Sequence, residues 1–272
     1  MKLLMKRGLL LGLALFSELT LCAGLVQAAP KVATTLPIAQ ALAEQLLHGT
    51  DIEAVYLPPK RLPVPRIGSW LQRKSADTVQ KQGPFAAIVT AESIWPAFAL
   101  YGKARRHNIH VVPVDIASEL NEPGARIRRS SEADDKSYFW LAPDNLLVSS
   151  QILARDFARI WPQQASQIQQ NQQQLRQQIQ RYAQALEQQL LAQDLMAVCL
   201  QSPRLMPLAE ATYLPVEQGE GCEADSLTIS KATAKSSAVT AGVWRVDAAD
   251  KPLKQGLDAW LQSNLKALAQ AF

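Results

Sequence analysis

The chain has 272 residues, of which 48% are hydrophobic and 19% are charged, a composition typical of globular proteins and unlike that of disordered chains. Its formal net charge is +4, and about +2 remains without the basic N-terminal segment, so charge gives no reason to expect nucleic-acid binding. Beyond that segment, roughly 240 residues suit one large domain or two smaller lobes.

Residues 1–28 have the order of a cleavable secretory signal. A basic start is followed by an apolar run over residues 8–16, and small residues flank the expected cleavage point at Ala28. The run is shorter than the about 20 residues that span a bilayer. We therefore predict a periplasmic protein with no membrane insertion after cleavage. Lipid attachment at Cys22 is the alternative, although Leu21 stands before it where lipobox sequences usually carry a small residue.

Cys199 and Cys222 are the only cysteines beyond this signal. In an oxidising compartment, two such cysteines favour a structural disulfide, and a loop of this size would stabilise the fold by about 3 kcal/mol. Two free, buried thiols are the alternative.

Strands and helices are expected to alternate through residues 29–140. The strands are predicted at 31–36, 52–57, 85–90 and 109–114, and the helices at 38–47, 67–80 and 93–106. The proline-rich stretch 60–66 is expected to be an ordered loop or an extended segment, and the polar stretch 119–136 an exposed loop. Such alternation predicts an α/β lobe built on a parallel sheet.

A helical pattern then covers residues 141–193, and Pro162 is expected to kink or restart it. Its second part is rich in glutamine but keeps apolar residues at helical spacing, which favours a long packed helix over a disordered tract. The residues of this stripe are Ile168, Leu175, Ile179, Tyr182, Leu186 and Leu190.

A smaller C-terminal α/β lobe is predicted over residues 194–272. Its expected strands are 196–200, 214–217, 227–230 and 243–246, and its expected helices are 204–213 and 253–272. The fold class is thus α/β, with two lobes of parallel-sheet βα units joined by one long helix.

Four local segments point to a known family by their order and spacing, although none is specific alone. They are residues 32–38 (VATTLPI) with 42–45 (LAEQ), residues 54–59 (AVYLPP), residues 140–145 (WLAPDN), and Asn264-Leu265 with Leu268. Together with the two lobes and the signal, they resemble the solute-binding proteins of zinc and manganese ABC importers. Against that family the second lobe looks abbreviated, since little room separates Cys222 from Trp244.

The resemblance implies a metal site made of three histidines and one carboxylate, a donor set that suits tetrahedral zinc. Here Val64, Tyr138 and Ser202 stand at the histidine positions, or Gln201 in place of Ser202 if the register slips. Asp247 stands at the carboxylate position. Valine has no lone pair, and serine and neutral tyrosine are poor zinc ligands. We therefore expect no tight metal site and no cofactor, because the ligand positions do not support zinc or manganese.

The three histidines that the chain does have, His48, His107 and His110, are expected to have surface or packing roles. Two of them flank a predicted strand start without a carboxylate or thiol partner in register. They therefore do not restore the metal site.

Arg66, Tyr138, Ser202 and Asp247 are the candidate residues of the cleft between the lobes. Such a set could bind a polar organic ligand or a preformed metal complex, because tyrosine stacks and arginine binds carboxylates. The equal alternative is that Tyr138 and Val64 fill the cleft, and that the protein is an adaptor acting through its outer surface.

The resemblance implies a monomeric binding protein of an ABC uptake system. Its expected partners are the importer membrane subunits or another periplasmic binding protein, and not nucleic acid. The sequence contains no GxSxG, HExxH, GxGxxG or P-loop motif, so we expect no enzyme. A helical scaffold would need a second exposed apolar stripe on residues 163–193, which the sequence does not clearly show.

Overall fold

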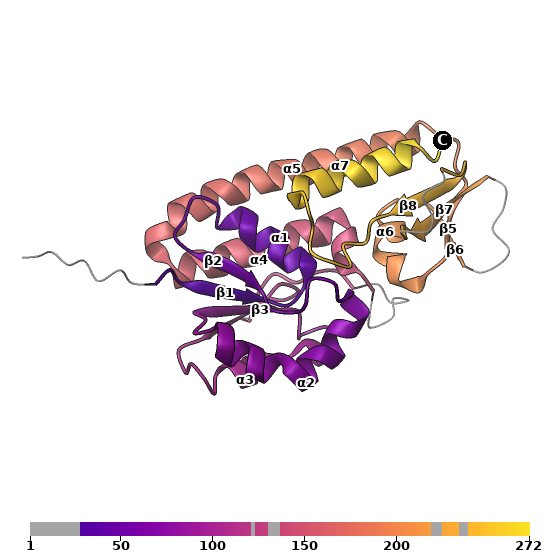
Figure 1. Ribbon diagram of the computed structural model, residues 1–272. Coiled ribbons are helices and arrows are strands. Elements are labelled where there is room, and N and C mark those ends of the chain that lie inside the picture. The colour runs from indigo at the N-terminus through magenta and orange to yellow at the C-terminus, as the bar shows by residue number, and fades with distance from the viewer. Residues whose placement is uncertain (1–27, 121–122, 130–136, 219–224, 234–238) are drawn as a thin grey trace, which may run out of the picture.

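The computed structural model describes residues 28–120, 123–129, 137–218, 225–233 and 239–272. They form two α/β lobes, with long helices running across the top of both (Figure 1). The predicted signal up to residue 27, with Cys22, lies outside the described residues. None of the described helices combines the length and the hydropathy of a membrane-spanning segment.

The first lobe is built on a parallel sheet with strand order β2-β1-β3-β4. Its strands are β1 (Lys31–Thr34), β2 (Glu53–Tyr56), β3 (Ala87–Thr90) and β4 (Val112–Asp115). β3 is buried along its whole length, as expected for a strand with helices on both faces. In Figure 1, helix α1 (Pro37–Leu46) lies above this sheet, and α2 (Val64–Gln82) and α3 (Tyr101–Ala104) lie below it.

The predicted loop 60–66 is wrong at its end, because α2 already begins at Val64. Pro63 is extended at the N-cap position, and Pro65 lies in the first turn of the helix. Proline is tolerated there because the first helical N–H groups have no partner within the helix. The start of α2 therefore reaches the junction between the lobes.

The predicted helix 93–106 is also wrong, since only the short 3-10 helix η1 (Pro96–Phe98) and α3 form there. Pro96 has no N–H to donate and disfavours helical geometry at the residue before it. Trp95 accordingly has φ −126° and ψ 83°. The apolar side chains of this segment pack as a turn beside α2 instead of as a helix face.

The second lobe repeats the same strand order, β6-β5-β7-β8, again with all pairs parallel. Its strands are β5 (Ala197–Leu200), β6 (Val216–Gln218), β7 (Ser226–Lys231) and β8 (Val243–Val246). Its helices are η4 (Pro203–Leu205), α6 (Met206–Glu210) and α7 (Gly256–Ala269). In the described parts of the β7–β8 connection no helix is present, and the second sheet has four strands, as the first has.

Cys199 of β5 is disulfide-bonded. Its predicted partner, Cys222, lies outside the described residues. The pairing of these two cysteines therefore stays a prediction.

Residues 141–193 contain two helices and not one. α4 (Pro143–Ile160) ends before Pro162, the 3-10 helix η3 (Pro162–Gln164) turns the chain, and α5 (Ala165–Leu191) packs back along α4. Gln172 Nε2 on α5 lies 3.4 Å from Ser150 Oγ on α4. The predicted restart at Pro162 thus takes the form of a reversal.

Helix α5 reaches both lobes. Near its start, Asn171 Nδ2 donates to the carbonyl oxygens of Leu46 and His48 in the first lobe, each at 2.8 Å. Near its end, Leu190 lines a cavity together with Leu214 of the second lobe. Every residue of the predicted apolar stripe is buried, so the prediction of a long packed helix is confirmed. With its two parallel sheets, the predicted α/β fold class is confirmed as well.

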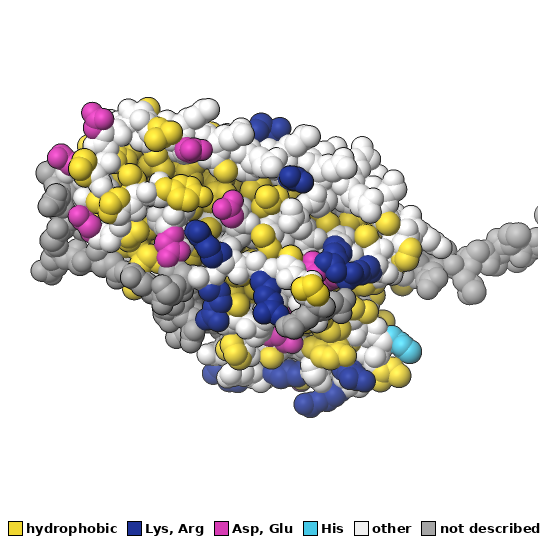
Figure 2. Space-filling view, turned by 180° about the vertical axis from the view of Figure 1, so that it is seen from behind, with side chains coloured by type: hydrophobic (Ala, Val, Ile, Leu, Met, Phe, Trp, Pro, Cys, Tyr) yellow, Lys and Arg dark blue, Asp and Glu magenta, His cyan; other side chains and the backbone are white. Residues whose placement is uncertain are grey.

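The two signs of charge are separated on the face opposite to that of Figure 1. In Figure 2, Lys and Arg side chains gather around the middle of this face, and Asp and Glu side chains gather towards the end formed by the second lobe. The visible surface therefore carries both signs of charge, largely in separate areas, and is not uniformly basic.

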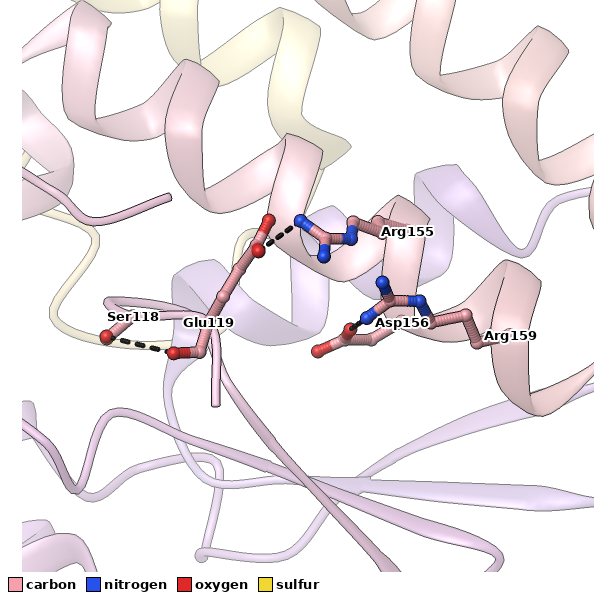
Figure 3. A network of polar contacts seen from close by, with 5 residues as sticks. All are labelled: Ser118, Glu119, Arg155, Asp156 and Arg159. Atoms are coloured by element: carbon pink, nitrogen blue, oxygen red, sulfur yellow. Dashed lines mark hydrogen bonds and ion pairs between the residues drawn. The ribbon is translucent and has the colours of Figure 1, made fainter. Parts of the chain in front are cut away.

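Glu119 is buried, although it belongs to the loop that the sequence predicts to be exposed. Its side chain is 5% exposed and forms an ion pair with Arg155 of α4 (Figure 3). Next to it, Asp156 Oδ1 lies 3.6 Å from Arg159 Nη1. Burial raises the pKa of the Asp156 carboxyl, and the nearby Arg159 opposes that rise. The first residues of this loop are thus attached to α4.

Replacing Arg155 with Met should lower the free energy of unfolding by about 2 kcal/mol, because the Glu119 carboxylate stays buried without its counterion. The expected loss in free energy of unfolding is modest because Arg155 is 41% exposed and water screens the ion pair. Urea denaturation measures the loss. The double variant Arg155→Met/Glu119→Gln should recover part of it, whereas Arg176→Met on the exposed face of α5 should cost under about 0.5 kcal/mol. Simple additivity of the two single losses would contradict the pairing.

Candidate functional site

The segments that follow the strands of both sheets meet between the lobes. Residues after β2 and β3 line one cavity together with Tyr138 and Arg204, and residues after β2, β7 and β8 line another. Ligands of open parallel sheets bind outside the carboxyl ends of the strands. This junction is therefore where the fold offers a binding site.

Asp250 connects the two lobes at this junction. Its backbone oxygen accepts a hydrogen bond from the N–H of Val64, at 3.1 Å, at the start of α2. Its carboxylate accepts a second from the Tyr138 hydroxyl, at 2.7 Å, and forms an ion pair with Lys231 at the end of β7. Lys231 Nζ also lies 5.8 Å from the centroid of the Tyr138 ring. We call Val64, Tyr138, Lys231 and Asp250 the seam cluster.

Burial controls the protonation of this cluster. It raises the pKa of the Tyr138 hydroxyl, although the nearby Arg204 opposes the rise, so the hydroxyl keeps its proton and can donate to Asp250. Burial also lowers the pKa of Lys231, and Arg204 acts in the same direction, whereas Asp247 raises it. The Asp250 carboxylate contacts the Lys231 ammonium and favours its charged form. Lys231 therefore contributes a positive charge to the seam cluster.

A tight turn brings Asp250 to this position. Ala249 has φ 51°, in the left-handed region that is costly for residues other than glycine. The Asp247 carboxylate stabilises the turn by accepting the Ala249 N–H at 2.9 Å. On the other side, the Asn264 side chain of α7 accepts the Asp247 N–H at 2.8 Å. The segment after β8 is therefore fixed to α7 at one end and directed towards α2 at the other.

Trp140 packs against Tyr138 of the seam cluster and is 1% exposed. Its indole N–H donates to the carbonyl oxygen of Ala248 at 3.1 Å. Its ring meets Trp95 at 5.6 Å and 75°, and Tyr138 at 5.2 Å and 42°, measured between ring centroids and ring planes. One indole thus packs against the segment after β3 in the first lobe and holds the segment after β8 in the second.

Two cavities flank the seam cluster. The first, which we call the groove, has a volume of about 600 Å³ and is lined by Arg61, Lys231, Asp247, Lys251, Lys254 and Trp260, among others. The second, which we call the apolar pocket, has about 260 Å³ and is lined mainly by Val64, Ile94, Trp95, Phe98, Tyr138 and Arg204. The cluster fills the space between them.

The structure brings some of the predicted cleft residues together and leaves others apart. Tyr138 belongs to the seam cluster with Val64, and Asp247 lines the groove. Arg66 is exposed on the first turn of α2, and Ser202 is half-buried before η4. Neither of these two lines the groove or the apolar pocket.

Sequence reasoning missed Lys231, Asp250 and Arg204. Lys231 ends β7, and Arg204 follows β5 after a short connection. Asp250 follows β8 in the same way. A signal did exist, because charged residues directly after the strands of a parallel sheet lie at its ligand-binding edge.

The side chains of the seam cluster offer few donor atoms to a divalent metal ion. Val64 offers no donor, the Tyr138 hydroxyl is committed to Asp250, and Lys231 puts a positive charge against that carboxylate. Within the part of the chain that the structure describes, no three His, Cys, Asp or Glu side chains are grouped so that they could hold a metal ion. The chain's histidines, His48, His107 and His110, are all exposed.

Comparison with known proteins identifies the fold. No family model matches the sequence, and no curated protein matches it closely. Among solved structures, it is similar to the metal-dependent lipoprotein YcdH from Bacillus subtilis, with 13% identity over 88% of this chain and 97% of that chain and a TM-score of 0.63. A structure of ZnuA has 16% identity over 89% of this chain and 97% of that chain, with a TM-score of 0.59.

A third neighbour is the Zn(II)-bound ZnuA-like domain of Streptococcus pneumoniae AdcA. It shares 14% identity over 90% of this chain and 99% of that chain, with a TM-score of 0.61. Identities this low establish the fold and not the ligand. The predicted resemblance is confirmed at that level, and this chain has the fold of the metal-type solute-binding proteins.

Proposed function

We propose that this protein is the exported solute-binding component of a zinc- or manganese-type ABC uptake system, and that the bare metal ion is not its ligand. The fold supports a binding protein rather than an enzyme. The observation that carries the second part is the ion pair of Lys231 with Asp250 inside the seam cluster.

The charge of Lys231 explains why a metal ion is disfavoured. Asp250 and Asp247 are the two carboxylates of the groove, and both lie near this ammonium. A divalent cation would have to displace Lys231 from Asp250 or accept a like charge beside it, and both are unfavourable. The side chain thus neutralises the donors that a metal would need.

The N-terminal sequence pattern supports periplasmic location after signal cleavage. The expected partners are the membrane subunits of the importer or another periplasmic binding protein, with this chain as a monomer. An adaptor that acts only through its outer surface is the other candidate, and it would leave the groove without a ligand.

Calorimetric titration of the metal-free protein from residue 29 onward tests the proposal. With Zn²⁺ or Mn²⁺ we expect no site of sub-micromolar Kd. The variant Lys231→Met, which removes the ion-pair partner of Asp250, should bind Zn²⁺ at least about 10-fold more tightly than the native chain, because one competing charge has been removed.

The matched control is Lys254→Met, which removes a charge from the same groove without freeing Asp250. It should change zinc affinity by less than about 3-fold, because exposed charges interact weakly. A zinc site of sub-micromolar Kd in the native chain would contradict the proposal.

A further inference from the structure

Building on the proposed role as a solute-binding protein, we propose that the groove is the ligand site and that its ligand is a small polycarboxylate anion. The groove adjoins the seam cluster and is lined by segments from both lobes. Its volume of about 600 Å³ lies within the range of about 300–1,000 Å³ that small-molecule sites have.

Positive charge predominates in the groove. Arg61 comes from the first lobe before α2, Lys231 from the end of β7, and Lys251 and Lys254 from the segment between β8 and α7. These four basic side chains face two acidic ones, Asp247 and Asp250. An anion is therefore the kind of solute that this surface attracts.

Both carboxylates of the groove already have partners. Asp250 is held by Lys231 and the Tyr138 hydroxyl, and Asp247 Oδ1 accepts the Ala249 N–H. Their internal contacts offset much of their repulsion towards an incoming anion, while Arg61, Lys251 and Lys254 are exposed to solvent. These three cations remain available to a ligand.

Other basic groups act on Lys231, which lines the groove. Besides burial, the neighbouring Arg204 and Lys251 lower the pKa of Lys231, which means that their charges act on it. A bound anion would relieve this mutual repulsion, so ligand binding gains from it.

The distribution of the cations favours several carboxylates over one phosphate. They come from three separate segments on two lobes rather than from one point. Trp260 adds an apolar wall, and Ser263 adds a hydroxyl group to the same groove. Carbon chains that carry spaced carboxylates match such a lining, and arginine pairs with carboxylates through two parallel hydrogen bonds.

Calorimetric titration with citrate tests this inference, using the protein from residue 29 onward. Separate arms use ferric citrate, inorganic phosphate and Zn²⁺ alone. We expect citrate or its ferric complex to bind with a Kd below about 100 µM, and to bind more weakly as salt rises from about 50 to about 300 mM. If citrate binds more tightly than ferric citrate, the ligand is a free polycarboxylic acid. If ferric citrate binds more tightly, the ligand is a metal chelate of such an acid.

Charge-removing variants localise the binding. The triple variant Arg61→Gln/Lys251→Gln/Lys254→Gln should raise the Kd about 30-fold, since each exposed cation contributes about 3-fold. The control Lys81→Gln/Lys266→Gln removes exposed charges elsewhere and should leave the Kd unchanged. Circular dichroism checks that both variants are folded.

The outcomes separate this inference from the proposed function. Absence of binding in both citrate arms, equal binding by the triple variant, or phosphate binding as tight as that of citrate would each overturn the inference. A tight site for Zn²⁺ alone would instead overturn the proposed function. If zinc, citrate and ferric citrate all fail to bind, the polycarboxylate site is wrong, whereas the proposal that the bare metal ion is not the ligand is supported.

Discussion

Asp250→Asn is expected to lower the free energy of unfolding by about 3 kcal/mol, as measured by denaturation in guanidinium chloride. The substitution keeps the shape of the side chain but removes the counterion of Lys231 and weakens the acceptor of the Tyr138 hydroxyl. Breaking a buried ion pair by removing one partner costs about 3–5 kcal/mol, because the other charge is left unpaired. Lys231 is 35% exposed, so the lower end of that range applies here.

A second substitution, at the ion-pair partner Lys231, tests this explanation of the loss. Lys231→Met added to Asp250→Asn removes the unpaired ammonium and should recover at least about 1 kcal/mol. Asp77→Asn, on the exposed face of α2, is the matched control and should change stability by less than about 0.5 kcal/mol. If Asp250→Asn behaves like Asp77→Asn, the seam cluster does not hold the lobes together.

Trp140→Ala is expected to cost about 4 kcal/mol, and it should also reduce the near-ultraviolet circular dichroism of the aromatic cluster. The indole is 1% exposed and lies against Trp95, Phe139 and Tyr138. Truncating such a side chain removes buried apolar area and leaves a cavity that the surroundings fill only partly. The Ala248 carbonyl also loses its N–H partner.

Two further variants separate packing from hydrogen bonding at this position. Trp140→Phe keeps most of the apolar contact but loses the N–H, and we expect it to cost about 2 kcal/mol. Trp161→Ala, at the far end of α4, removes a half-buried indole and should cost less than Trp140→Ala. Equal losses at Trp140 and Trp161 would contradict a central role for Trp140.

The sheet and helix alternation could be predicted because burial leaves a periodic pattern in the sequence. The stripe from Ile168 to Leu190 is the clearest case, since every one of its residues is buried on α5. The reversal at Pro162 could be predicted as a break, but its direction depends on tertiary packing. The segment after Ser93 was misjudged because its apolar residues have helical spacing while Pro96 forbids the helix.

The site was harder to predict than the fold. Val64 and Tyr138 could be identified from the resemblance, because they stand at fixed offsets from recognisable segments. No sequence pattern predicts the Lys231–Asp250 ion pair, because an ion pair has no periodicity. The pair also depends on the turn at Ala249, which brings Asp250 to Lys231. Contacts across a chain reversal depend on backbone geometry that local sequence does not specify.

The position of α7 bears on the order in which the chain folds. α7 lies beside α5 in Figure 1 and also contacts α1, so the first described helix shares a surface with the last. About 210 residues separate Leu46 from Gly256, which at about 5–20 residues per second is about 10–40 s of synthesis. The part of α1 that contacts α7 stays uncovered during that time, although the contacts of α1 with β2, α4 and α5 can already form. The first lobe therefore reaches its full set of contacts only after the C-terminal helix has been synthesised.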